Sequence, residues 1–376
     1  MALPPRWLLR LVLGGALLGL AGSDAGALPR YAARYGQKCL LCHDDPAGGG
    51  KRNAYASQYL VPTEMVLRPP AAEGAAAIDP QLNEHISLGA DLRTLYRYHP
   101  EAARKAADNL FQMQGDLYLH IQVDARLSLH LEQGLSGGGE AYGLAFLLPA
   151  GGYLKAGRFT PSFGWRFADH SQFVRAESGF APPADLDVGL ELGLFPAGAT
   201  SLSLGLFNGA GGQVLDGDNR PALALRGEWR PELGALKAGL GGSLYRDEEA
   251  GAGRERRLGG PFASLALGPL TWLGECDWER RETAAGEEPT ALVASQELCW
   301  ALRPGLELRA TLDFHDADVH ARSGSRRRAG LGVDLLATPF IGLTAMVNWH
   351  DTQPGPALSA GDADYADSYL ILHFLY

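Results

Sequence analysis

The chain has 376 residues, with 49 glycines and a formal net charge of -10 at neutral pH. This acidic balance argues against nucleic acid as a partner, because binding to phosphate depends on clustered lysine and arginine. After about the first twenty positions no apolar run is long enough to cross a membrane as a helix, so we expect no interior transmembrane helix.

The first 27 residues have the pattern of a secretory signal peptide. Arg6 and Arg10 precede an apolar stretch that ends at Leu20, and the small residues Ala25 and Ala27 follow. This order predicts export and cleavage after about Ala27. An uncleaved anchor helix is the alternative.

A cysteine motif, Cys39-Leu40-Leu41-Cys42-His43, follows the signal peptide. Two thiols at this spacing with an adjacent imidazole form the attachment pattern of c-type haem, in which the thiols form thioethers and the imidazole binds iron. A zinc site would need a second ligand pair, and a redox dithiol would need a βαβ context; the sequence before Leu60 offers neither. We predict one covalent haem c, attached at Cys39 and Cys42, with His43 as the proximal iron ligand.

Residues 28–83 form a small haem-binding segment in this interpretation. A turn at Gly48-Gly49-Gly50 is followed by a short stretch compatible with a helix. A unit of this size can hardly bury a haem by itself, so it needs a wall from elsewhere in the chain.

Residues 84–376 alternate between apolar and polar side chains. In 306–315, for example, Leu308 and Leu312 alternate with Arg309 and Asp313. Such alternation predicts strands with one apolar and one polar face, and the polar face is expected to be wet. Short turns alternate with long polar loops, which is typical of an outer-membrane β-barrel; a soluble β protein is the alternative.

About 16 strands are expected, beginning near residues 84, 110, 124, 139, 151, 184, 199, 220, 234, 256, 269, 290, 305, 326, 339 and 364. A barrel of this size has a lumen that holds water, whereas eight strands would fill with side chains. The haem segment is therefore expected on the periplasmic side or inside the lumen. The final strand ends at the aromatic residue Tyr376.

The distal iron ligand has several candidates. Met65 is the methionine nearest to the motif, and alternation directs His85, His120 and His373 inward on the first, second and last strands. His130 on the third strand points the same way. A solvated lumen residue is the ordinary alternative for each histidine, and together they form the expected docking surface of the haem.

Cys276 and Cys299 lie on successive strands, but their positions in the alternation put them on opposite faces, which argues against a disulfide.

The expected outer loops place histidines beside acids, at Asp169-His170, 315–320 and His350-Asp351. Such pairs suit Fe(II) or another divalent ion, with loop polarity as the ordinary explanation. The long aromatic loop 163–183 is expected to fold into the lumen as a constriction.

The arrangement resembles the fused outer-membrane monohaem cytochrome–porins of the iron-oxidising type. The resemblance rests on the stretch from Arg34 to His43 after the signal peptide, a glycine-rich turn and a barrel of about 16 strands. Only Cys39, Cys42 and His43 carry over individually. It implies a Gram-negative outer membrane and electron transfer from extracellular Fe(II), or another metal, to a periplasmic c-type cytochrome or similar carrier.

Two other functions are open. The chain could be a solute porin whose haem segment is a plug or redox sensor, or one component of a multi-protein electron conduit. No covalent chemistry on a substrate is required, so the chain is an enzyme only if it oxidises a specific donor.

Overall fold

The protein is described by a computed structural model for residues 29–71, 79–99, 109–135, 138–178, 180, 186–196, 199–209, 220–249, 254–282, 286–321, 324–353 and 364–376. The predicted signal peptide, residues 1–27, lies outside this part of the chain.

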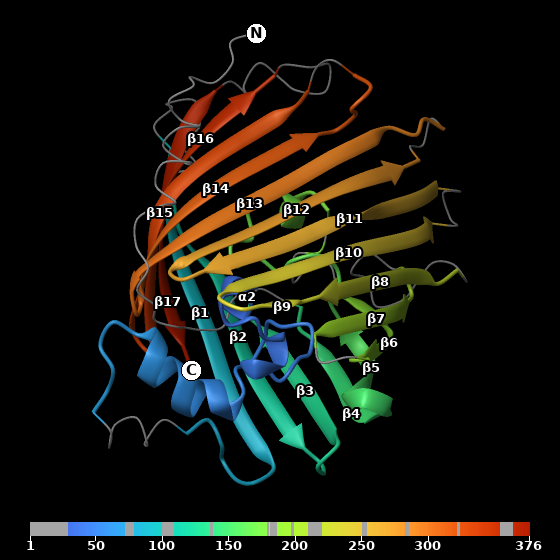
Figure 1. Ribbon diagram of the computed structural model, residues 1–376. Helices are drawn as coiled ribbons and strands as arrows, with labels where there is room; N and C mark the ends of the chain where they lie inside the picture. The colour runs from blue at the N-terminus through green and yellow to red at the C-terminus, as the bar shows by residue number, and fades with distance from the viewer. Residues whose placement is uncertain are drawn as a thin grey trace.

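Antiparallel strands form one closed barrel (Figure 1). The first strand, β1 (Ile86–Tyr98), pairs with β2 (Asn109–Gln122) on one side and with the last strand, β17 (Tyr365–Leu375), on the other. Closure leaves no free sheet edge. The sheet has 17 strands, of which β9 (Glu232–Leu233) has only two residues, so 16 strands form the wall.

The predicted strands match the observed ones, with starts that agree within about three residues. The remaining strands are β3 (Leu127–Gly134), β4 (Ala141–Leu148), β5 (Gly152–Phe159), β6 (Asp187–Leu194), β7 (Thr200–Phe207), β8 (Ala222–Trp229), β10 (Leu236–Glu249), β11 (Arg254–Leu267), β12 (Leu270–Arg281), β13 (Thr290–Arg303), β14 (Leu306–Asp316), β15 (Arg326–Thr338) and β16 (Ile341–Thr352).

The two ends of the barrel differ in their connections. At one end, the short 3-10 turn η5 (Pro149–Gly151) joins β4 to β5, and equally tight turns join β11 to β12 and β13 to β14. At the other end, residues 160–186 separate β5 from β6. The short-turn end is the periplasmic end in outer-membrane barrels.

The outer face of the wall is apolar. On β14, Leu308 and Leu312 are exposed, whereas Arg309 and Thr311 point into the barrel and are buried. A closed barrel with such a surface is built for an outer membrane. Within the described residues, no helix is both long and apolar enough to span a membrane.

The N-terminal segment, residues 29–71, enters the lumen from the short-turn end (Figure 1). It contains α2 (Pro29–Tyr35), which packs against β10, β11 and β12, then η2 (Cys39–Leu41) and the π-helix η3 (Ala56–Met65). After η3, the backbone N–H groups of Leu67 and Arg68 donate to carbonyls at the end of β15. The segment therefore lies in and across this mouth.

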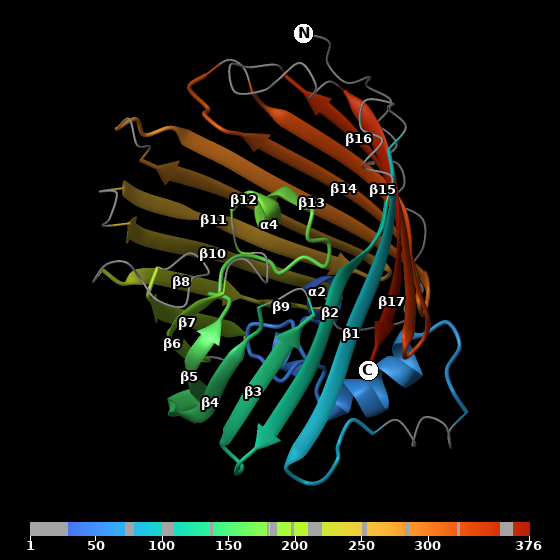
Figure 2. The same cartoon turned by 180° about the vertical axis from the view of Figure 1, so that it is seen from behind.

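The inserted loop, described at residues 160–178, 180 and 186, fills a second part of the lumen. Its short helix α4 (Phe173–Ala176) contacts β12, β13 and β14 (Figure 2). Phe163 and Phe180 of the loop stack at 4.8 Å and belong to an aromatic cluster with Phe159 and Phe207 on the wall. The predicted constriction is confirmed for the described part of this loop.

Because of these two insertions, the expectation of a wet inner face is wrong in the filled part of the lumen. Glu307, Arg309 and Asp313 of β14 are all less than 5% exposed. Alternation correctly predicts that these side chains point inward, but it gives no information on whether other parts of the chain cover them.

Candidate functional site

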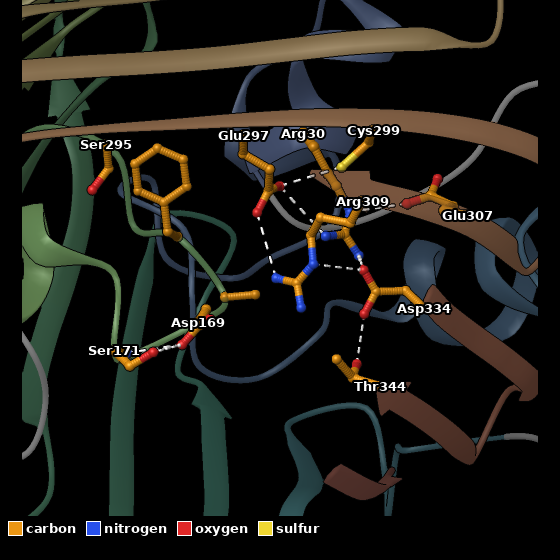
Figure 3. Close-up of polar contacts among 12 residues, drawn as sticks. Arg30, Asp169, Ser171, Ser295, Glu297, Cys299, Glu307, Arg309, Asp334 and Thr344 are labelled. Carbon is orange, nitrogen blue, oxygen red and sulfur yellow. Dashed lines mark hydrogen bonds and ion pairs between the residues drawn. The ribbon is translucent and has the colours of Figure 1, made fainter. Parts of the chain in front are cut away.

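The α2 helix carries a buried arginine into a group of wall carboxylates (Figure 3). The Arg30 guanidinium lies 3.0 Å from Glu307 on β14, 3.4 Å from Glu297 on β13 and 3.3 Å from Asp334 on β15. A guanidinium presents several donors in a fixed plane and so can contact acids from three strands at once.

Two more arginines balance the charge of this group. Arg309 lies 3.5 Å from Glu297 and 3.1 Å from Asp334, and Arg34 of α2 lies 2.6 Å from Glu307. Three guanidinium groups thus face three carboxylates away from water. Because an unpaired charge in such surroundings is costly, the network fixes α2 against β13, β14 and β15.

A second anchor holds the turn that follows the cysteine motif. Asp45 accepts a hydrogen bond of 2.8 Å from Lys155 on β5, whose side chain is fully buried. Burial favours the neutral form of Asp45, but Lys155 and Arg166 outweigh it and lower the pKa of Asp45 to about 2. Arg166 of the inserted loop also donates to the Gly48 carbonyl at 2.6 Å. The turn is thereby fixed to both the wall and the loop.

Between the N-terminal segment, the inserted loop and the wall lies a cavity of about 320 Å³. This volume is in the range of small-molecule and cofactor sites, about 300 to 1,000 Å³. Cys39, Cys42 and His43 all line it, so the structure brings the whole predicted attachment motif to one cavity.

The residues present fit a covalent haem. Cys39 and Cys42 are free thiols, and burial raises the pKa of both, that of Cys42 to about 12. Burial also lowers the pKa of His43, which keeps the imidazole in the neutral form that binds iron. At Gly48, with φ of +81°, an added Cβ would lie 3.0 Å from the Cys39 sulfur, so the missing side chain leaves room beside the thiol.

Of the predicted distal ligands, Met65 and His373 line this cavity. Met65 is 3% exposed and belongs to an apolar cluster that includes Cys42 and Leu60. His373 is held by the wall: its Nε2 lies 2.8 Å from an Asp91 carboxylate oxygen and 3.3 Å from Nε of Arg93.

His120 and His130 lie on the wall beside the N-terminal segment but do not line the cavity. Their rings meet edge to face at 4.5 Å, and His130 stacks on Tyr142 at 4.7 Å. His120 Nδ1 lies 3.8 Å from Asp44 of the segment. His120 therefore contacts the N-terminal segment, and the proposed docking of the haem against these two histidines stays a prediction.

His85 does not line the cavity. His85 precedes β1, its side chain is 58% exposed, and its Nδ1 lies 2.9 Å from the Gln122 carbonyl. The backbone N–H groups of His85 and Ile86 both donate to the Asn83 side chain, which forms a turn there. Alternation does not apply before the strand begins.

The Asp169-His170 pair lies on the long loop between β5 and β6, and because this loop folds inward, the pair lies inside the barrel. Tyr369 of β17 donates to Asp169 at 2.6 Å, and Arg328 of β15 donates to Ser171 at 2.7 Å. His170 lines the same cavity as the cysteine motif, and burial lowers its pKa to about 3. The aromatic residues around this pair were the sequence signal for the insertion.

The other pairs of histidine and acid do not converge. His320 is exposed and its Nδ1 lies 3.1 Å from Asp318, while His315 and His350 lie on β14 and β16. In the described part of the chain, no three His, Cys, Asp or Glu residues are grouped so that they could hold a metal ion.

The two barrel cysteines are unbonded, as predicted. Cys276 pairs in register with Ala294, and Cys299 pairs with Thr271. Cys299 is fully buried, with its sulfur 3.5 Å from Glu297. Cys276 shares the outer face of β12 with the exposed Trp278, so the two thiols lie on opposite faces.

No protein-family model matches the chain, and no curated protein matches it. Solved structures do. An anion-selective porin from Comamonas acidovorans matches with a TM-score of 0.57 and 11% sequence identity, covering 77% of this chain and 99% of the porin. OprB of Pseudomonas putida matches with a TM-score of 0.59 and 10% identity, covering 78% and 94%.

The outer membrane channel DcaP of Acinetobacter baumannii matches with a TM-score of 0.54 and 12% identity, covering 77% of this chain and 97% of DcaP. Identities this low establish shared architecture only. The chain therefore has the closed 16-strand barrel fold of the porins.

Proposed function

We propose that the chain transfers electrons in the outer membrane by means of one covalent haem c, held in the lumen of a porin-type barrel. The observation that carries the proposal is the position of Cys39, Cys42 and His43, which together line one cavity between the N-terminal segment and the wall. This position supplies the wall that a segment of this size lacks by itself.

The residues have distinct roles in this proposal. Cys39 and Cys42 would hold the haem by thioether bonds, and His43 would bind the iron. Haem supplies a one-electron couple, whose potential is set by the second axial ligand, nearby charge and solvent exposure. Met65 and His373 are the predicted distal ligands that line the cavity.

The filled lumen supports electron transfer better than free diffusion of solutes through this part of the barrel. The Arg30 network and the Lys155–Asp45 pair fix the N-terminal segment to the wall, and the inserted loop covers its other side. The segment and the loop thus occupy this part of the lumen. As the resemblance implies, Fe(II) or another extracellular donor would supply electrons to a periplasmic carrier.

The first measurement is the covalent haem content of the purified, exported protein. We expect one haem per chain that stays attached after denaturation, and loss of attachment when Cys39 and Cys42 are both replaced by alanine. In liposomes, Fe(II) added on the loop side should reduce the haem. A wild-type protein without covalent haem contradicts the proposal.

The second candidate is a solute porin in which the N-terminal segment is a plug. The porin fold of the similar structures favours it, one of them being described as anion-selective. Conductance in planar bilayers separates the two functions. Steady open-channel current that ignores the redox state of the protein supports the porin, whereas electron transfer that requires an added cytochrome supports a multi-protein conduit.

A further inference from the structure

The cavity has a histidine that alternation along the strands does not single out. Three histidines in the described part of the chain line it: His43, His170 and His373. His43 is the proximal ligand under the proposed function, which leaves two imidazoles for the second axial position.

The imidazole of His373 is already engaged. Its Nε2 lies within hydrogen-bond distance of both Asp91 and Arg93, and all three residues belong to the wall. Moving this ring to a new partner would leave the partly buried Asp91 carboxylate without that contact, which costs free energy.

The imidazole of His170 has no hydrogen bond or ring contact to any other described residue. A partly buried imidazole without such a contact, on the edge of a cavity, is available to bind a metal. It belongs to the same cavity as Cys39 and Cys42 but comes from a distant part of the sequence, through the inserted loop.

The backbone on both sides of His170 is fixed. On one side, Asp169 accepts hydrogen bonds from Tyr369 and from the Ser171 hydroxyl, both at 2.6 Å. On the other, Arg328 donates to Ser171 at 2.7 Å, and the backbone N–H of Phe173 at the start of α4 donates to Asp313 at 3.2 Å. A ligand held in this way loses little conformational entropy on binding.

Met65 differs from His170 in its surroundings. It is 3% exposed and packs in the apolar cluster of the N-terminal segment with Cys42, Leu60 and Val61, so packing explains its position without a bond to iron. By contrast, the contacts of Asp169 and Ser171 fix the loop on both sides of His170, and the His170 imidazole lines the cavity.

We propose that His170 is the second axial ligand of the haem iron, so that the inserted loop and the N-terminal segment each supply one imidazole. This inference rests on the proposed function and adds to it a structural link between the two insertions of the lumen. Two imidazoles give a low-spin iron, and their basicity favours a lower potential than a methionine ligand gives.

The test uses the full-length protein in detergent, with the spin state of the iron measured by absorption and electron paramagnetic resonance. We expect His170→Gly to keep its covalent haem and barrel fold but to lose most of the low-spin signal, and added imidazole to restore it. His170→Met should stay low-spin with a raised potential. His320→Ala, at an exposed histidine, is the matched control and should resemble the wild type.

Other outcomes overturn the inference. If His170→Gly stays low-spin, or if Met65→Leu or His373→Gln loses the low-spin signal instead, His170 is not the ligand, and the proposed function stands. A five-coordinate, high-spin wild type likewise excludes His170 as a ligand. Absence of covalent haem from the wild type contradicts the proposed function itself.

Discussion

Nη1 of Arg34 lies 2.6 Å from a carboxylate oxygen of Glu307, and both side chains are only 4% exposed. This pair joins α2 to β14, and Glu307 also contacts Arg30 at 3.0 Å. One wall carboxylate therefore pairs with two arginines of the N-terminal segment.

Glu307→Gln should loosen the N-terminal segment. The change leaves two buried guanidinium groups short of one negative charge, and breaking a buried ion pair in this way costs about 3 to 5 kcal/mol. We expect faster proteolysis within residues 29–71 and a larger single-channel conductance. Glu248→Gln is the control, because Glu248 pairs with the exposed arginines Arg220 and Arg246, and such pairs contribute only about 0 to 1 kcal/mol. Equal behaviour of the two variants would show that the network does not hold the segment.

The Lys155–Asp45 pair predicts a non-additive effect of mutation. Lys155→Met leaves the buried Asp45 carboxylate with Arg166, at 3.7 Å, as its remaining cation, so we expect docking of the turn to lose up to about 3 to 5 kcal/mol. The double variant Asp45→Asn/Lys155→Met removes both charges and should lose less than Lys155→Met alone. Hydrogen exchange of residues 44–53 measures the effect, and a double variant that is as destabilised as the sum of the single ones contradicts it.

Gly48→Ala should impair haem attachment. The residue has φ of +81°, and an added Cβ would lie 3.0 Å from the Cys39 sulfur. Gly234→Ala has a similar backbone constraint, with φ of +67°, but an added Cβ there meets nothing within 4 Å. Both variants carry the strain of a positive φ, about 1 to 2 kcal/mol, but only Gly48→Ala crowds the thiol. The haem content per chain should fall in Gly48→Ala alone; an equal fall in both assigns the effect to the backbone.

The thiols of Cys276 and Cys299 should remain separate under oxidising conditions. They lie on opposite faces of neighbouring strands, so a direct bond would need a change of register. After denaturation without reductant, we expect alkylation of both Cys276 and Cys299. Any cysteine that is linked to haem by a thioether has no free thiol and is not counted. An unreduced protein that gains alkylation at these positions only after reduction would show a disulfide and contradict the register of β12 and β13.

The barrel was largely predictable because strand alternation is a local property. The pattern of each strand indicates which side chains share a face, and the long aromatic insertion before β6 indicates a loop with its own packing. The position of each histidine along the barrel axis was harder to predict from the sequence. His85 illustrates the limit, since an Asn83 turn before β1 changes its direction.

The contacts of the N-terminal segment could not be derived from sequence patterns. Arg30 and Glu297 lie 267 positions apart, and the alternation of β13 marks Glu297 as inward-facing without indicating which cation it meets. His170 presents the same difficulty. The sequence predicts that its loop folds into the lumen, but the position of His170 there depends on hydrogen bonds from β15 and β17 to its neighbours Ser171 and Asp169.

The long sequence separation between the N-terminal segment and its wall partners also sets the order in which these contacts can form during export. A chain exported from its N-terminus presents residues 29–71 long before β13, β14 and β15 arrive, so Arg30 and Arg34 have no carboxylate partners from these strands during that interval. Loop-closure entropy also delays contacts between positions so far apart. The folded chain buries Cys42 but leaves Cys39 partly exposed, so we expect covalent modification of Cys42 to precede barrel closure.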